Sequence, residues 1–449
     1  MKAKLAALAA AAVVLAGCTA SPTPPATSEP APVETVATPT ATAEPTRGMS
    51  LADGRPMLWG INMLEYTGES GTDIINRLGF VTATGERIES KYLSYDYCLG
   101  ADGNPTRVVV STPTALEVLA LTGERTAEIP VEHPYFVSCV ADRIIAAYNN
   151  EWNYRLDDTT AAYDLKTNKF LDLPAFLTAS APLQEDTFLD YLASVAEPDR
   201  PFCLNDDDEG EPGQPNRFMS VTGQVLSESI GCGRFHGNYA EVEDVETESS
   251  YLVDRSLNVV PEYPNGVGVV LGPWDEPVAY WGTDSNGVNN LLDLDLNVLA
   301  STDVERGIDC EDGSLWCGVV NGSGLIVVDL TTGEATGVPG FSNPIALFAT
   351  NADRTRAYSL ATGAQFDLPS CTDDWYGWDR LTCQWEDNDH AFWASGARSS
   401  GSVWVKWWYA GPQIPTGIVY FAQTARYQGY VDANGDWLYK ESVYQELRD

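Results

Sequence analysis

One pattern recurs along the chain and restricts its fold more than any other feature. At residues 325–339 an apolar run rich in β-branched residues is followed by two threonines and Gly333, and then by a weaker strand that ends in proline. This pattern is typical of a β-hairpin, in which Gly333 supplies the positive φ of the turn. Residues 358–369 and 162–174 are near copies. The sequence therefore predicts a repetitive all-β protein.

Turns of this kind recur over most of the chain. They fall at Gly85, Gly123, Asn168, Gly223, Leu257, Asn297, Gly333, Gly363 and Gly435. If one unit is missed in the last interval, the mean spacing is about 39 residues, and periods of about 20 to 50 indicate solenoids, propellers or arrays. Four short strands per unit suit a blade, so we predict a β-propeller of about seven or eight blades. Because the spacing between neighbouring turns is irregular, a pair of β-sandwiches is the alternative.

Some copies carry a second pattern. Residues 78–88, followed by Tyr92, read as Gly-aromatic-Val, a turn ending in glycine, and a strand leading to tyrosine, and residues 428–438 match this better. The pattern resembles the WG-type repeat of bacterial surface and periplasmic proteins. The chain departs from it at the Trp-Gly pair, which occurs only at Trp59 and Trp281, out of register with these turns. The resemblance implies an all-β surface module and brings no catalytic residues with it.

The first residues have the pattern of a secretory signal peptide: Lys2 and Lys4, a short uncharged apolar run, and small residues before Cys18. The run Leu-Ala-Gly-Cys resembles the lipobox of bacterial lipoproteins. This resemblance implies cleavage after residue 17, a diacylglycerol on the Cys18 sulfur, and a lipid-anchored position on the outer face of the cytoplasmic membrane, at the cell surface. The alternative is an ordinary signal peptide with a chance cysteine.

The composition divides the chain into three regions. Residues 1–17 form the signal peptide, residues 18–47 a tether rich in Pro, Thr and Ala, and residues 48–449 the β-repeat domain. The tether has almost no large apolar side chain, so it cannot offset its ordering entropy and is expected to be disordered. Helix signal is scarce: residues 183–196, with apolar residues at helical spacing, are the predicted helix.

The chain is strongly acidic, with 64 Asp and Glu against 26 Lys and Arg and a formal net charge of −38. Such a charge argues against nucleic acid and anionic membrane surfaces as partners. Solubility and self-repulsion outside the cell account for it, and recruitment of a cationic ligand is the alternative.

Eight cysteines remain when Cys18 is set aside. They are Cys98, Cys139, Cys203, Cys232, Cys310, Cys317, Cys371 and Cys383. An even number in an exported chain favours disulfides, and their grouping suggests pairs in sequence order. The pairs Cys310/Cys317 and Cys371/Cys383 are the most strongly suggested, because each closes a short polar loop.

Aromatic residues gather near the C-terminus. On one face of the strand at residues 403–409, Trp404 and Trp408 flank Lys406. Such a row is a candidate ligand-binding surface, able to stack on a sugar ring or to hold the lysine by a cation–π contact. The alternative is that the row belongs to the core between blades, because blades are covered on both faces.

Other chemistry has weaker support. Asp432, Asn434 and Asp436 alternate around a glycine and are a candidate calcium site, but Asn-Gly is also a common hairpin turn and the remaining EF-hand ligands are missing. The three histidines lie far apart without a metal-binding spacing, and no nucleophile elbow accompanies them. No other metal site and no catalytic residue is indicated.

These features favour a non-catalytic binding or scaffolding module at the cell surface, with a protein or a glycan as ligand. The alternative is a glycan-active hydrolase with a pair of carboxylates on the propeller. An acidic pair in which one member has a raised pKa would favour the hydrolase.

The lipid anchor can be tested at Cys18. Replacing Cys18 by Ala removes the sulfur to which the lipid is attached, so the exported protein should move from the membrane fraction to the soluble fraction. Fractionation followed by immunoblotting measures this, with Thr19→Ala as the control that stays on membranes. A Cys18→Ala protein that still sediments with membranes would contradict the anchor.

Overall fold

The computed structural model describes the chain between Gly54 and Ser442, and these residues belong to one compact unit. The gaps in that range are 68–72, 132–133, 149, 152–154, 157–159, 179–183, 205–216, 228–231, 245–248, 265, 275, 306, 311–312, 323, 346–347, 361–362, 364, 368–380, 386–387, 393–419, 424–426 and 432–436. Among the described residues, no helix is long and apolar enough to span a membrane.

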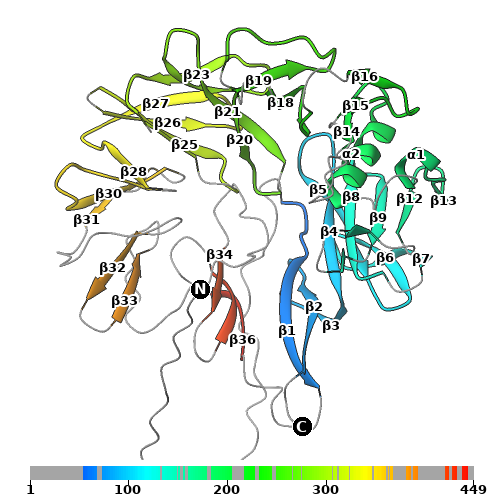
Figure 1. Cartoon of the computed structure of the whole chain (residues 1–449). Helices are drawn as coiled ribbons and strands as arrows, with labels where there is room; N and C mark the ends of the chain where they lie inside the picture. The colour runs from blue at the N-terminus through cyan, green and yellow to red at the C-terminus, as the bar shows by residue number, and fades with distance from the viewer. Residues whose placement is uncertain are drawn as a thin grey trace, which may run out of the picture. The chain divides into compact units, whose positions relative to one another are not determined.

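The described strands form a succession of antiparallel sheets, coloured in chain order in Figure 1. The first half contains β1 (Trp59–Thr67), β2 (Asp73–Val81) and β3 (Arg87–Tyr92); β4 (Ser94–Leu99), β5 (Pro105–Ser111), β6 (Ala115–Ala120) and β7 (Arg125–Pro130); β8 (Phe136–Val140), β9 (Ile144–Tyr148), β12 (Ala161–Asp164) and β13 (Lys169–Phe170), with the inserted hairpin β10 (Asn150–Glu151) and β11 (Arg155–Leu156); and β14 (Phe202–Leu204), β15 (Arg217–Met219) and β16 (Val225–Ser227).

The second half continues in the same way. It contains β17 (Phe235–His236), β18 (Tyr239–Asp244) and β19 (Ser249–Asp254); β20 (Gly268–Leu271), β21 (Pro277–Thr283), β22 (Asn289–Leu292) and β23 (Val298–Thr302); β24 (Ile308–Cys310), β25 (Trp316–Asn321), β26 (Gly324–Asp329) and β27 (Glu334–Pro339); β28 (Asn343–Ile345), β29 (Phe348–Thr350), β30 (Arg356–Ser359) and β31 (Gln365–Asp367); β32 (Leu381–Trp385) and β33 (Asn388–Phe392); and β34 (Tyr420–Gln423), β35 (Tyr427–Val431) and β36 (Trp437–Ser442).

Central strands of these sheets bury both of their faces. In β5, Val108 and Val110 share a cluster with β1 and β2, whereas Val109 between them shares a cluster with β8 and β9. In β26, Leu325 and Val327 face the next sheet, and Val328 faces the preceding one. Strands buried on both faces read as continuous apolar runs, which explains why the repeats show little alternation.

The last described sheet packs against the first. The Tyr430 ring of β35 lies 5.5 Å from the Trp59 ring of β1, and the Tyr430 hydroxyl donates a hydrogen bond to the Gly60 carbonyl. Contacts also join sheets that are distant in sequence. The ring of Trp274, in the connection after β20, lies 5.0 Å from the Tyr97 ring of β4. From β1 to β31 each main sheet shares an apolar cluster with the next, and the last described sheet contacts the first, which is the arrangement of propeller blades.

The all-β prediction is confirmed, and the sheet order is that of a propeller. Two sandwiches would leave one face of each sheet exposed, whereas these sheets are covered by the sheets before and after them. Within the described residues, five sheets have four strands and the rest have two or three. The number of blades stays a prediction, because residues 368–380 and 393–419 flank the last sheets and lie outside the described part.

A five-residue turn closes many of the hairpins. The amide of its first residue donates to the carbonyl of the fifth, and the carbonyl of the first accepts the amide of the fourth, which has positive φ, as at Gly85 and Leu257. Where the fourth residue is not glycine, an aspartate at the first position caps the turn: Asp254 accepts the amides of Ser256 and Asn258 at 2.8 and 2.9 Å. Side-chain caps of this kind fix a turn that otherwise favours glycine.

The predicted turn positions agree with the structure, with one correction. Positive φ occurs at Gly85, Gly123, Asn168, Gly223, Leu257, Gly333 and Gly363. In the turn predicted at Asn297, the residue with positive φ is Leu296, because Asp293 is the first residue of that turn and Asn297 is the fifth. The turn predicted at Gly435 lies outside the described residues.

Two short helices interrupt the sheets between β13 and β14. They are α1 (Ala175–Thr178) and α2 (Glu185–Ala196). The helix predicted at residues 183–196 is therefore confirmed as α2, which buries Phe188 and Leu192 against β9 and β14. The sequence did not predict α1.

Three disulfides join cysteines that are neighbours in sequence order. Cys98–Cys139 connects β4 to β8, Cys203–Cys232 connects β14 to the segment before β17, and Cys310–Cys317 joins the paired strands β24 and β25. The first two link adjacent sheets, whereas the third lies within one sheet. The predicted Cys371/Cys383 pair lies outside the described residues, because the structure describes neither Cys371 nor the side chain of Cys383.

The two kinds of disulfide should differ in their effect on stability. A disulfide stabilises more when it closes a longer loop, and the sequence separations are 41 for Cys98–Cys139 and 7 for Cys310–Cys317. The double Cys→Ala variant of the first pair should therefore lose about 1.5 kcal/mol more than that of the second pair. Urea unfolding of both variants measures the difference, and an equal loss would contradict this account.

Candidate functional site

Two exposed aromatic side chains, Tyr135 and Trp281, lie at the same end of their sheets. In each four-stranded sheet, one end is formed by the starts of the first and third strands and by the ends of the second and fourth strands. We call this end the leading edge. In the β20–β23 sheet the leading edge is formed by Gly268, Thr283, Asn289 and Thr302, as the register pairs show. The chain therefore enters and leaves a four-stranded sheet at this edge.

Trp281 is a large aromatic side chain at the leading edge of the β20–β23 sheet. It is 50% exposed, although its neighbour Tyr280 is buried. Trp281 pairs with Gly268 across β20 and β21, and a Cβ atom at Gly268 would lie 2.4 Å from the indole Cε2 and Nε1 atoms. The indole therefore lies across the glycine. Glycine is the residue that allows this close approach.

A row of hydroxyl and amide side chains stands beside Trp281. Thr283, Asn289 and Thr302 are successive cross-strand partners. The Thr283 hydroxyl donates to Asn289 Oδ1 at 2.7 Å, and Asn289 Nδ2 donates to the Val304 carbonyl at 3.3 Å. Thr302 Oγ1 accepts the Val304 amide at 3.0 Å. The contacts between these groups hold the row and the following loop in place.

A second aromatic group lies at the leading edge of the β8–β13 sheet. Tyr135 is 51% exposed and packs edge-on against Phe136, with ring centroids 4.8 Å apart. Phe136 stacks on Tyr148 at 5.9 Å. The Tyr148 hydroxyl donates to Glu185 in the first turn of α2, so the helix holds the Tyr148 ring in place.

The most deeply buried carboxylate of the described residues lies on α2. Asp190 is 2% exposed and is paired with Arg200 at 3.2 Å and with Arg234 at 3.6 Å. Burial raises the pKa of the Asp190 carboxyl, and the charges of Arg200 and Arg234 oppose this shift. Its ion-pair partners are cations, and the charge of Asp186, one helical turn earlier on α2 and 3.9 Å from Arg234, adds to the raised pKa. Asp190 is therefore best explained as part of an ion-pair network that ties α2 to β17.

His236 lies in the same network. Burial, followed by the positive charges of Arg234 and Arg200, lowers the pKa of the His236 imidazole to about 4. The Tyr280 hydroxyl donates to the His236 carbonyl, and Arg255 donates to the carbonyl of Gly237 at 3.0 Å. These contacts join β17 to β21 and to the end of β19. The neutral imidazole is the form that the fold accommodates.

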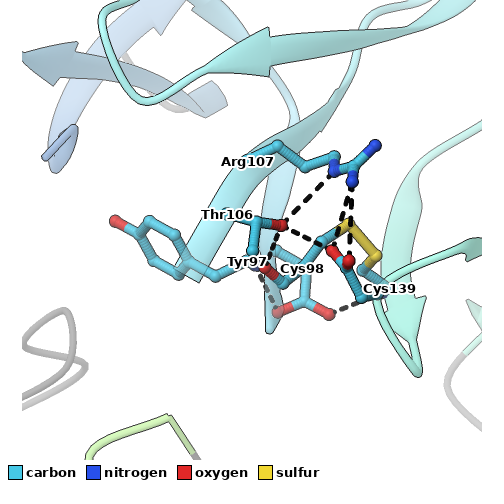
Figure 2. Close-up of a disulfide and its surroundings, with 7 residues drawn as sticks. Tyr97, Cys98, Thr106, Arg107 and Cys139 are labelled. Carbon is cyan, nitrogen blue, oxygen red and sulfur yellow. Dashed lines mark hydrogen bonds and ion pairs between the residues drawn. A yellow bond between two sulfur atoms is a disulfide. The ribbon is translucent and has the colours of Figure 1, made fainter. Parts of the chain in front are cut away.

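Between β4 and β8, the opposite end of the sheets is held by structural contacts. Figure 2 shows the Cys98–Cys139 disulfide with Thr106 and Arg107 on the neighbouring strand. The Thr106 hydroxyl donates to Asp142, which has a positive φ of 57°, and Arg107 pairs with the same carboxylate at 3.5 Å. A non-glycine residue with positive φ is costly, and these contacts hold it. The cluster stabilises the joint between β4 and β8.

The sequence-predicted site residues lie outside the described part of the chain. This applies to Cys18, to the row Trp404, Lys406 and Trp408, and to the calcium candidates Asp432, Asn434 and Asp436. Among the described residues, no group of three or more His, Cys, Asp or Glu side chains is placed to hold a metal ion.

Trp281 is the candidate site residue that sequence reasoning missed. The sequence places Trp281 in an apolar strand. In such a strand, the sequence pattern does not distinguish a tryptophan in the core from one at the edge of the sheet. The available signal was Gly268 on the preceding strand, since a glycine opposite a tryptophan indicates a close approach of the ring to the backbone. The register that pairs the two was not visible in the sequence.

No family model and no curated protein matches the chain. Among solved structures, it is similar to the dihydro-heme d1 dehydrogenase NirN, at 12% identity over 80% of this chain and 74% of that chain, with a TM-score of 0.32. It is also similar to AztD from Citrobacter koseri, at 10% identity over 69% and 94% with a TM-score of 0.29. It is also similar to Hsv2 from Kluyveromyces lactis, at 12% identity over 68% of this chain and 90% of that chain, with a TM-score of 0.27. At these values the likenesses carry no argument about function.

The environment of His236 predicts a pH dependence. The unfolded chain takes up a proton near pH 6.5, whereas the folded chain does so only near pH 4. Stability is therefore present above about pH 6.5 and is lost as the pH falls towards about 4. Urea unfolding at pH 7 and pH 5 should show a smaller loss in His236→Gln than in the parent. An identical loss in both would contradict this assignment.

Proposed function

We propose that the protein is an exported, lipid-anchored binding module that contacts a glycan or a protein of the cell surface through the leading edge of its sheets. The observation that carries the proposal is the exposure of Tyr135 and Trp281, about half of each, at the leading edges of two sheets. Half-exposed aromatic residues on a rigid scaffold are typical of binding surfaces. The resemblance of the N-terminal residues to a lipobox supports the anchored position.

Binding is preferred to hydrolysis because of the carboxylates. A glycan hydrolase needs two carboxylates about 5 to 9.5 Å apart, one of them with a raised pKa. Asp190 has a raised pKa and a neighbouring carboxylate in Asp186, but it is buried and paired with Arg200 and Arg234, so a glycan does not reach it. This arrangement favours a structural role for Asp190. The scaffold, together with the exposed aromatic residues, accounts for a ligand-holding function without catalysis.

Binding to isolated cell envelopes tests the proposal. The exported Cys18→Ala protein should bind envelopes saturably and release no reducing sugar from them, and the same protein reduced and alkylated should bind less. Periodate oxidation of the envelopes removes glycan ligands, and protease treatment removes protein ligands, so each treatment identifies one class. Absence of saturable binding contradicts the binding module, and release of reducing sugar contradicts its non-catalytic character.

A further inference from the structure

We propose that Trp281 is a stacking platform for a pyranose ring of a neutral glycan, with Thr283 and Asn289 binding the hydroxyl groups of the sugar. This inference rests on the proposed binding function and narrows it to one ligand class and one sheet edge. Three observations carry it: the support of the indole, the polar row beside it, and the charge around it.

The indole is held in one orientation before any ligand arrives. Because the ring lies across Gly268, one side of it is covered by backbone and the ring is 50% exposed. Aromatic side chains fixed in this way bind flat apolar surfaces with little loss of side-chain entropy. The apolar face of a pyranose ring, formed by its axial C–H groups, has that shape.

The polar row has hydrogen-bonding capacity left for a sugar. Asn289 Nδ2 carries two hydrogens, and one of them is used by the Val304 carbonyl. The Thr283 oxygen donates its hydrogen to Asn289 and keeps acceptor lone pairs. Thr283 follows Trp281 by two residues on the same face of β21, about 6.7 Å along the strand. A ring stacked on the indole therefore has hydroxyl-binding groups beside it.

The charge around the platform selects among glycans. Asp284 and Asp303 are next to Thr283 and Thr302 in sequence, and the chain as a whole carries −38. An anionic polymer would be repelled by this surface. The leading edge of the β20–β23 sheet therefore suits a neutral glycan better than an acidic one.

The test uses neutral oligosaccharides and variants of the exported Cys18→Ala protein. The probes are the β-1,4-linked hexamers of glucose and of N-acetylglucosamine and the α-1,4-linked hexamer of glucose, measured by titration calorimetry. At least one should bind, and Trp281→Ala should weaken that binding about tenfold or more, as expected for an aromatic anchor. Trp281→Phe should retain most of the affinity, because it keeps a ring on the same support.

Two further variants separate stacking from folding. Gly268→Ala keeps the indole but displaces it, so it should weaken binding while leaving Trp281 in place. Val298→Ala removes another half-exposed apolar side chain, at the opposite end of the same sheet, and should change the affinity less than twofold. Thermal midpoints of all variants show whether a loss of binding results from unfolding. If Trp281→Ala unfolds, the affinities of Trp281→Phe and Gly268→Ala test the stacking platform instead.

Two results would overturn the inference. One is binding of a hexamer that Trp281→Ala leaves unchanged, which would place the glycan elsewhere. The other is no binding of any hexamer at millimolar concentration. If envelope binding is then saturable and is removed by protease but not by periodate, the proposed function stands and the glycan platform falls. If envelope binding is absent as well, both fall.

Discussion

The burial of both faces of the sheets between β4 and β27 is the constraint on which the rest of the structure depends. A strand such as β5 contributes Val108 and Val110 to one neighbouring sheet and Val109 to the other. No sheet of this kind can be stable alone, because each leaves apolar surface that only the next sheet can cover. The contact of Tyr430 with Trp59 and Gly60 meets the same need for the first and last sheets, which would otherwise each keep a bare face.

The same constraint explains where the polar groups are found. With both faces apolar, polar side chains are left to the edges, where they cap turns or join neighbouring elements. Asp254 and Asp293 hold turns in which leucine takes the position usual for glycine. Asp190 joins α2 to Arg200 and Arg234. Part of the acidic composition is therefore structural, because aspartates serve where a tight turn needs a hydrogen-bond acceptor.

The sequence revealed local structure better than it revealed the site. Turns such as Gly85 and Leu257, the helix α2 and the sequence-order disulfides depend on residues near one another in the chain, and their patterns are readable there. The exposure of Trp281 depends on its register with Gly268 and on its distance from the end of β21. Neither is encoded locally, since a one-residue shift in register would turn the indole to the other face. The lipobox, the aromatic row at Trp404 and the calcium candidate at Asp432 stay predictions.

The division between faces and edges also limits what a ligand can contact. The faces are consumed by packing between sheets, so a partner meets only the edges and the outermost strands. Between β4 and β8, the edge near Cys98 and Cys139 is occupied by the disulfide and by the contacts of Asp142. The leading edge instead carries Tyr135 and Trp281. Both rings are half exposed, and packing between sheets does not require this exposure. The scaffold supports both rings through packed neighbours, Phe136 for Tyr135 and Gly268 for Trp281, so the proposed binding surface is preorganised.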